Sequence, residues 1–253
     1  MLRFFSKIRY KLASENSLAK YSRYAFGEIL LVVLGILFAL QVNNWNEERK
    51  ELADKSKMLL SLQNEIQSNL ILVNNHIYQK NKIVQSCQQL FKYTGPNPQF
   101  PDTISFDSLL NIVLISGWLF SPQNAILTDI LNSNKLNLLK NDSLKILLGS
   151  LTHDISLIQS EEEVFRHELH NYILPFVGER YPTRNMTPER SLFEIDFSLD
   201  KSKFNISPES LLKNVEFESI VNTEFIWNKI SLAFYNGLRL KYQKILALIE
   251  IED

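Results

Sequence analysis

One apolar segment near the N-terminus constrains this chain more than any other feature of its sequence. Residues 25–42 read AFGEILLVVLGILFALQV, and the two strongly polar members, Glu28 and Gln41, lie near the two ends. An α-helix of this length rises about 27 Å, close to the roughly 30 Å hydrocarbon core of a bilayer. We therefore predict a transmembrane helix over residues 25–43.

Aromatic residues flank this segment at the spacing of a bilayer. Tyr21 and Tyr24 precede it, and Trp45 follows it. The 21 residues from Tyr24 to Trp45 cover about 31 Å as a helix, which matches the distance between the two interfacial belts where Tyr and Trp gather. We predict that these three side chains lie at the membrane interfaces.

A cleaved signal peptide is the main alternative to an uncleaved anchor, because it also places an apolar stretch behind basic residues. Here 24 residues precede the apolar segment, and no pair of small residues in the A-x-A arrangement follows it. Both features favour the uncleaved anchor.

Charge bias sets the expected orientation. Residues 1–24 contain six basic residues and one acidic residue, whereas residues 45–57 balance four basic residues with four acidic ones. The positive-inside rule then leaves the N-terminus in the cytoplasm and the bulk of the chain on the far side. We predict a cytoplasmic tail (1–24), the transmembrane helix (25–43) and an exported domain (44–253).

The tail has the pattern of a basic amphipathic helix. Leu2, Phe4, Phe5, Ile8 and Leu12 recur at helical spacing, with Arg and Lys residues between them. This pattern predicts a helix that lies on an anionic membrane face. A tail that docks on another protein is the alternative.

The exported part begins as a continuation of the same helix. No Gly or Pro occurs between Gly35 and Gly95. Beyond the span, apolar residues recur mostly at steps of three, four or seven, as they do in a helix that packs along its length in a coiled coil or bundle. The segment TGPNPQFPD, residues 94–102, ends this helix.

Four further helices are predicted. They cover residues 105–116, 121–132, 143–174 and 223–253. Ser121 with Pro122 would start the second of these, and Asn141 or Asp142 would cap the third.

Pro175 would end the third of these helices, and a long surface loop with weak strand signals at 193–197 would follow, over residues 176–208. Asn222 or Thr223 would cap the last helix, with Ile230 on its apolar face. The predicted fold is all-α: the transmembrane helix continues into a long amphipathic helix, which packs in an exported helical bundle.

Composition excludes some classes of partner. The chain of 253 residues has 27 basic and 28 acidic residues, a net charge of -1. Because nucleic-acid binding normally needs a basic patch or stripe, we expect no nucleic-acid partner.

Small and polar residues within the span are candidates for contacts inside the membrane. Gly35 and Ala39 are four residues apart, a spacing that lets helices approach closely, and Gln41 lies near the exit. Glu28 lies about one turn inside the span, where the helix dipole and nearby basic residues can stabilise its charge. A partner contact or a proton-linked role for Glu28 is the alternative.

Motifs for catalysis or metal binding are weak in this sequence. Glu163, His167 and His170 share one helix face, but HELH is neither H-E-x-x-H nor a di-iron signature. We expect no metal, no cofactor and no enzyme activity. The acidic run at 161–163 is interpreted as a solvated helix face. The lone Cys87 lies at core spacing, although in an oxidising compartment it could pair between subunits.

Three further aromatic residues, Trp118, Phe120 and Trp227, are interpreted as core aromatics rather than a ligand cage. His76 has no neighbours in the sequence that point to a site.

Two stretches of the sequence resemble a known family. Residues 27–47, GEILLVVLGILFALQVNNWNE, and residues 120–144, FSPQNAILTDILNSNKLNLLKNDSL, are similar to the bacterial single-span membrane proteins of the domain-of-unknown-function family 6090. Members often have Ser-Gly where this chain has Ser133-Asn134, and Asn is the next best residue for a left-handed turn. The resemblance implies an inner-membrane anchor with a helical periplasmic domain, and it supplies no activity.

We therefore expect a membrane-anchored periplasmic helical scaffold or interaction protein that oligomerises or binds other envelope proteins. The alternative is a sensory domain that binds a small ligand and signals through the single membrane helix to a separate partner. An envelope hydrolase or metal enzyme that uses His167 and His170 is the third hypothesis and the weakest.

Overall fold

The computed structural model describes residues 18–100, 105–114, 119–186 and 199–252. The predicted tail helix and the strand signals at 193–197 lie outside these residues. By its internal contacts the chain divides into two compact units, Met1–Lys57 and Met58–Asp253.

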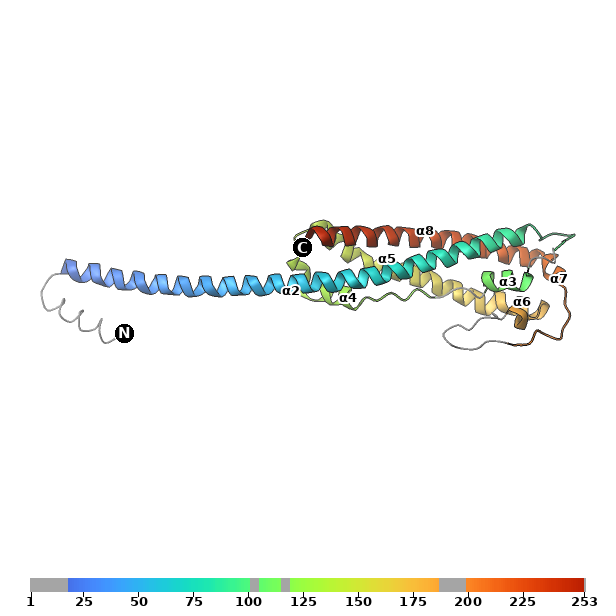
Figure 1. Cartoon of the computed structure of the whole chain (residues 1–253), viewed down its shortest axis with the longest axis horizontal. Helices are drawn as coiled ribbons and strands as arrows, with labels where there is room; N and C mark the ends of the chain where they lie inside the picture. The colour runs from blue at the N-terminus through green and yellow to red at the C-terminus, as the bar shows by residue number, and fades with distance from the viewer. Residues whose placement is uncertain (1–17, 101–104, 115–118, 187–198, 253) are drawn as a thin grey trace. The chain divides into compact units, whose positions relative to one another are not determined.

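Helix α2 (Leu18–Phe91) belongs to both units and runs without a break through the apolar segment and the amphipathic stretch (Figure 1). The prediction of one continuous helix is confirmed. Among the described helices, this one is long and apolar enough to cross a membrane. In the first unit its large apolar side chains between Phe26 and Val42 are all exposed.

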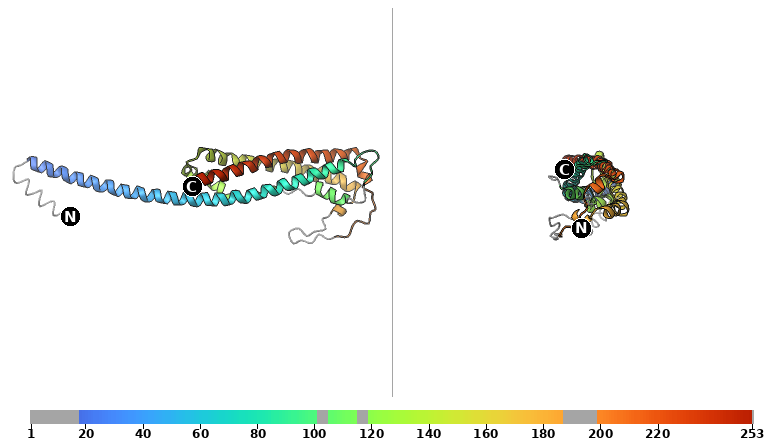
Figure 2. Two further views of the ribbon diagram at one scale, coloured as in Figure 1. Left: turned by 45° about the horizontal axis from the view of Figure 1, so that its top comes forward. Right: turned by 90° about the vertical axis from the view of Figure 1, so that its right-hand side faces the viewer.

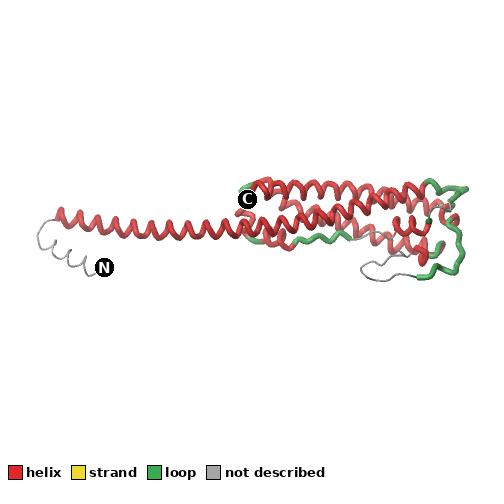
Figure 3. The backbone as a smooth tube through the Cα atoms, viewed as in Figure 1, coloured by secondary structure: helices red, strands yellow, loops and turns green. Residues whose placement is uncertain are grey.

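The second unit consists of helices and loops, with no strand among its described residues (Figure 3). This confirms the predicted all-α class. After α2 come α3 (Phe106–Leu114), α4 (Ala125–Asn132), the 3₁₀ turn η1 (Asn134–Leu138), α5 (Asp142–Glu168), the π-helix η2 (Leu169–Ile173), α6 (Leu174–Arg180), the 3₁₀ turn η3 (Thr183–Met186), α7 (Glu209–Leu212) and α8 (Val215–Glu252).

Three long helices form the body of this unit. Helix α5 packs against α8, and the second half of α2 lies beside both, as the side and end-on views of Figure 2 show. The carboxylate of Glu252 ties the end of α8 to the start of α5, because it accepts the N–H groups of Lys140 (2.5 Å) and Asn141 (2.9 Å). The other end is closed where the Gly95 N–H, at φ 139°, donates to the Leu212 carbonyl of α7 (3.0 Å).

Two separate apolar clusters fill the second unit. The first joins α2, α4, α5 and α8 and includes Leu62, Leu148 and Ile245. The second joins the end of α2 to α3, α6, α7 and the start of α8 and includes Leu110 and Val221. Cys87 is fully buried in the second cluster, so the prediction of a core cysteine is confirmed and pairing between subunits through it is blocked.

The prediction that Pro175 ends the helix over residues 143–174 is wrong. The helix passes from α5 through η2 into α6, and Pro175 lies in the first turn of α6. A proline is tolerated there because first-turn N–H groups do not need an i−4 partner, and the π-helix has already shifted the hydrogen-bond ladder. The Asn141 cap is confirmed, since its side chain accepts the Leu144 N–H at 3.2 Å.

The predicted start of the last helix is also wrong, by about two turns. Helix α8 begins at Val215, where the Asn214 side chain accepts the Glu216 N–H at 2.8 Å. Phe217 lies in these additional turns and is buried in the second cluster, and this packing stabilises them as helix. Ile230, which was expected on the buried face, is exposed.

Ser121 and Pro122 do not start the helix predicted over residues 121–132, because α4 begins only at Ala125. A residue of another helix supplies its cap. The buried Glu65 of α2 accepts the N–H groups of Ile126 (2.8 Å) and Leu127 (2.9 Å). A carboxylate from another helix thus caps the N-terminus of α4 in place of a local N-cap side chain, and its charge complements the helix dipole.

Candidate functional site

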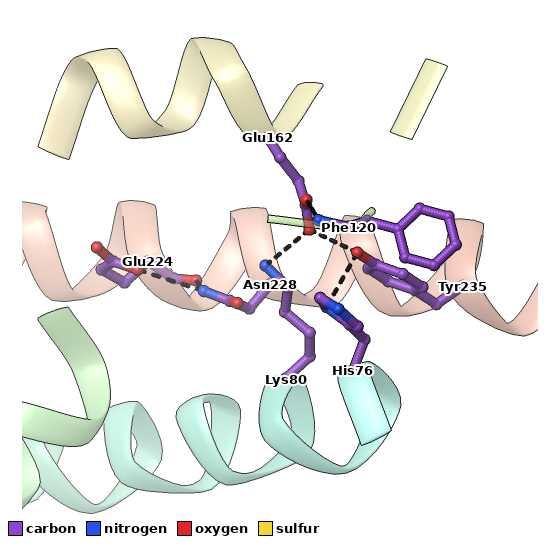
Figure 4. Close-up of polar contacts among 7 residues, drawn as sticks. All are labelled: His76, Lys80, Phe120, Glu162, Glu224, Asn228 and Tyr235. Carbon is purple, nitrogen blue, oxygen red and sulfur yellow. Dashed lines mark hydrogen bonds and ion pairs between the residues drawn. The ribbon is translucent and has the colours of Figure 1, made fainter. Parts of the chain in front are cut away.

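A buried layer of polar side chains separates the two apolar clusters of the bundle. We call it the polar layer, and it comprises His76 and Lys80 of α2, Glu162 of α5, and Glu224, Asn228 and Tyr235 of α8 (Figure 4). All six are less than 8% exposed. Because burying polar groups costs free energy unless they are paired, the hydrogen bonds of this layer decide what it can do.

Glu162 is the best-satisfied acid of the polar layer. Its carboxylate accepts the backbone N–H of Phe120 at 2.7 Å and the hydroxyl of Tyr235 at 2.5 Å. The ammonium of Lys80 lies 3.8 Å from the same carboxylate. These donors come from three different segments of the chain, so one side chain of α5 links α2, α8 and the segment before α4.

The imidazole of His76 is held by Tyr235. The two rings stack with centroids 5.1 Å apart, and Nδ1 lies 3.2 Å from the Tyr235 hydroxyl. Since that hydroxyl gives its proton to Glu162, the network assigns the proton between the two groups to His76 Nδ1. Burial lowers the pKa of His76 more than the Glu162 charge raises it, so the ring is neutral at pH 7.

Glu224 is the incompletely paired acid of the polar layer. It is 1% exposed, and one oxygen, Oε2, accepts the Asn228 Nδ2 at 3.3 Å. The other, Oε1, has no partner within the described residues, and neither has Asn228 Oδ1. Burial raises the pKa of Glu224 to about 8, against the opposing effects of the Lys80 charge and the Asn228 hydrogen bond.

A cavity of about 230 Å³ is lined in part by Glu224 and Asn228. Its polar part is formed by six residues: Lys80, Glu162, Arg166, His170, Glu224 and Asn228. The apolar lining comes from α2, α3, α5 and neighbouring segments, and it includes Ile83, Val113, Leu114, Phe165 and Leu169. The cavity therefore combines a few convergent polar groups with apolar walls, which is the composition of a small-molecule site.

The π-helix η2 contributes to the wall of this cavity. Leu169 and His170, its first two residues, line the cavity at the point where α5 changes from α- to π-helical hydrogen bonding. Such π segments occur frequently at functional sites, because they shift side chains out of the α-helical register.

The segment before α4 is held to the bundle by side chains of α2 and α5. The amide of Gln159 donates to the Phe120 carbonyl at 3.0 Å. Asn69 makes a reciprocal pair with Gln123: its Nδ2 donates to the carbonyl at 2.6 Å, and its Oδ1 accepts the N–H at 2.8 Å. Residues 120–127, the start of the second stretch that carries the family resemblance, are thus fixed beside the polar layer.

The membrane-segment candidates precede the polar layer in the chain and belong to the first unit. Tyr21 and Tyr24 lie in α2, and Trp45 is largely exposed on the same helix. The candidate polar and packing residues, Glu28, Gly35, Ala39 and Gln41, also belong to α2.

The weak metal candidates do not come together into a site. Glu163 pairs with Arg166 at 2.6 Å, and His167 and His170 are exposed. Within the described part of the chain, no group of three His, Cys, Asp or Glu side chains is arranged to hold a metal ion.

The interpretation of residues 161–163 as a solvated face is wrong at its centre. Glu162 is buried, while Glu163 is exposed. A signal for this was present in the sequence: Glu162 continues the three- and four-residue steps of the apolar stripe formed by Ile155, Ile158, Phe165 and Leu169. A charged residue at a stripe position predicts a buried, paired charge.

The same signal applies to other members of the polar layer. Lys80 lies between Val73 and Cys87 on the buried face of α2, and Glu224 follows Val221 by three residues on α8.

Of the aromatic candidates, Phe120 is buried in the first cluster, and Trp227 is half-buried and stacks on Phe165 with centroids 5.7 Å apart. Trp118 lies outside the described residues.

Comparison with known proteins gives one match. A family model described as a family of unknown function, DUF6090, matches residues 28–162. No curated protein and no solved structure matches the chain. The matched region includes Lys80, and it includes Glu65 and Glu162 together with the segment whose backbone N–H groups they accept.

We predict that Tyr235→Phe lowers the free energy of unfolding by about 1–3 kcal/mol, because it removes a hydroxyl that bonds both Glu162 and His76. Tyr242→Phe is the matched control. Tyr242 is equally buried on α8, but its hydroxyl has no partner within the described residues, so this change should alter stability by less than about 0.5 kcal/mol. Chemical unfolding of the full chain in detergent, followed by circular dichroism, measures both. Equal losses in the two variants would contradict the network.

We predict that Glu224 makes stability depend on pH. Its pKa of about 8 in the folded chain lies above the ordinary value of 4.5, so between these values the folded state keeps a proton that the unfolded chain releases. The wild type should therefore lose stability relative to Glu224→Gln as pH rises from 5 to 8, by at most about 1.4 kcal/mol per unit, and level off above pH 8. Glu216→Gln, an exposed change on the same helix, is the control. A difference between wild type and Glu224→Gln that stays constant from pH 5 to 9 would contradict this assignment.

Proposed function

Because this chain belongs to the DUF6090 family, whose function is unknown, we propose its role from its physical features. We propose a single-span membrane protein with an exported helical domain that acts as a scaffold or interaction module, without catalysis. Its proposed partners are the lipid bilayer, further copies of the chain and other envelope proteins, and none of them is a nucleic acid.

The exposed apolar surface of α2 is the observation that carries the proposal. Twelve large apolar side chains between Phe26 and Val42 are exposed. Because burying one such side chain is worth about 1.5–3 kcal/mol, leaving all of them in water forgoes roughly 18–36 kcal/mol, more than the whole stability of a typical domain. A lipid environment removes this cost.

The second unit supports the same conclusion, because it does not need the apolar segment for its own core. Both apolar clusters are built from residues that follow residue 57. The apolar face of the amphipathic half of α2 is therefore buried against α5 and α8. The apolar side chains of the other half remain available for contact with lipid. This division supports a membrane anchor joined to an independent helical domain.

The proposed orientation places the N-terminus in the cytoplasm and the bundle in the bacterial periplasm. It rests on the excess of basic residues before the apolar segment.

Self-association is proposed to occur through the span. A Cβ added at Gly35 would meet no atom within 4 Å, so the chain's own packing does not explain a glycine there. Together with Ala39 it leaves a shallow face on which a second helix can approach closely.

A sensory ligand-binding domain is the second candidate function, and the cavity beside the polar layer favours it. Glu224 and Asn228 each contain a buried oxygen without a partner among the described residues, and both residues line this cavity together with apolar side chains. A ligand bound there would contact side chains of α2, α5 and α8. Any signal would pass through the membrane helix to a separate cytoplasmic protein.

We predict that a cysteine at residue 68 reacts with a membrane-impermeant maleimide in intact spheroplasts, whereas a cysteine at residue 6 reacts only after lysis. Ser68→Cys is exposed on the bundle part of α2, and Ser6→Cys lies in the basic tail. Native Cys87 adds little background, because burial raises its pKa to about 12. If Ser6→Cys is labelled in intact spheroplasts and Ser68→Cys is labelled only after lysis, the proposed orientation is wrong.

We predict that Gly35→Cys forms a disulfide-linked dimer under mild oxidation in membranes. Leu37→Cys is the matched control, because two residues further along the helix it points to nearly the opposite face. A strong dimer band for Gly35→Cys and a weak one for Leu37→Cys are expected on non-reducing gels. Equal bands, or none for either variant, would rule out association through the Gly35 face.

A further inference from the structure

Helix α8 has a second apolar stripe on the side that faces away from the core of the bundle. Its buried stripe runs from Val221 to Ile249 in steps of three and four residues. A separate set of residues repeats the same alternation of steps but is exposed to solvent, on a helix that lies along one side of the bundle (Figure 1). We call this set the outer stripe, and it comprises Ile226, Ile230, Ala233, Gly237, Leu240, Lys244, Ala247 and Ile251.

The spacing of the outer stripe suits contact with another helix. Alternating steps of three and four residues average 3.5 residues, the period that keeps one face of a helix against a second helix over many turns. The outer stripe keeps this period from Ile226 to Ile251, which is about 38 Å of helix. Its four large apolar side chains are between 45% and 76% exposed, so the fold of one copy leaves the stripe uncovered. An exposed apolar stripe of this length indicates a contact surface.

Small residues make the outer stripe shallow near its centre. A Cβ added at Gly237 would meet no atom within 4 Å, so packing within the chain does not require a glycine there. Glycine inside a helix is destabilising relative to alanine, and Gly237 therefore has a cost that the single copy does not explain. A large side chain of a second helix can occupy the space above Gly237.

The outer stripe complements itself when two copies of α8 lie antiparallel. With a two-fold axis midway between residues 237 and 240, Leu240 of each copy lies over Gly237 of the other. The next layers pair residue 233 with 244, residue 230 with 247 and residue 226 with 251. In every layer except the outermost, a large side chain meets a small one, so the two helices keep an even separation. The two-fold operation forms each of these pairs twice, as in an isologous interface.

Charges at the edge of the outer stripe favour the same arrangement. Lys229 and Glu250 each precede a stripe residue by one position, so they lie on the same flank, and both are exposed. Neither forms an ion pair within the described part of the chain. Antiparallel pairing brings Lys229 of each copy beside Glu250 of the other, and such flanking charges set the orientation of paired helices. Parallel pairing would instead place Lys244 against Lys244 of the second copy, which is repulsive.

We propose that the outer stripe of α8 binds the outer stripe of a second copy of this chain in an antiparallel pair, with Leu240 over Gly237 and Lys229 beside Glu250. This inference rests on the proposed scaffold function and adds to it a contact between exported domains, which is made by other residues than the contact proposed for the span. Within the second unit, α2 enters the bundle at the end where α8 finishes (Figure 2). The partner is therefore a copy whose bundle points in the opposite direction.

The test uses the full chain in detergent micelles, where two copies are free to take either direction. Ile226→Cys and Ile251→Cys are prepared with tags of different mass and treated with a short bis-maleimide. An equal mixture should give a crosslinked pair that contains both tags, because residues 226 and 251 meet in the antiparallel pair. Each variant alone should give little product, because its two cysteines would lie about 38 Å apart along the helices. Ser156→Cys, exposed on α5, measures random collision, and the buried Cys87 adds little background.

Exchange of the flanking charges tests the pairing directly. Lys229→Glu in both members of the mixture puts like charges together at both ends of the pair, and it should slow the initial rate of mixed crosslinking about tenfold. Glu250→Lys should have the same effect. The double variant restores opposite charges and should return the rate to within about threefold of the starting value. Both residues are exposed, so the fold should not change, and circular dichroism checks this.

Each contrary outcome has a defined meaning. If each variant crosslinks to itself and the mixture gives no mixed product, the copies pair in parallel and the proposal is wrong. If the mixture reacts no faster than Ser156→Cys, the outer stripe is not a contact between copies. A double charge exchange that fails to restore the rate overturns the pairing of Lys229 with Glu250. The Gly35→Cys dimer reports separately on association through the span, so the scaffold function stands if that dimer forms while the α8 contact fails.

Discussion

The carboxylate of Glu162 is the interaction on which the arrangement of the bundle depends. A buried charge costs several kcal/mol unless donors surround it, and here the donors are a backbone N–H at Phe120, the Tyr235 hydroxyl and the nearby Lys80 ammonium. Each comes from a different segment, so sliding α2 or α8 along α5 by one turn would remove one of the groups that pair with this charge. Apolar packing alone tolerates many registers, and this carboxylate selects one.

The two buried acids of the polar layer differ in a way that separates structure from function. Glu162 has a full set of donors and needs nothing more. Glu224, with an unpaired oxygen and a pKa raised by burial, is as deeply buried but incomplete. Stability alone would favour an apolar residue or a better-paired one at this position, and an incompletely satisfied buried group beside a cavity is where a ligand gains most from binding.

Much of the fold follows from the sequence, because apolar periodicity and scarce Gly and Pro determine where long helices can form. Periodicity within one segment could not predict how side chains and backbone from other segments would act on it. Glu65 of α2 caps α4, so no local cap marks its start. The π-helix absorbs Pro175, which by local rules should end a helix. Glu162 was misread because the charge of its neighbours outweighed its position on the apolar stripe.

Continuity of α2 connects the two candidate functions physically. His76 and Lys80 of the polar layer lie on the same helix as the apolar segment, and that helix has no Pro and no break between them. A ligand can shift a conformational equilibrium only by its difference in affinity for the two states. A ligand in the cavity would contact Lys80 and Ile83 of α2 as well as side chains of α5 and α8, and a difference in these contacts between two states would supply such a difference in affinity.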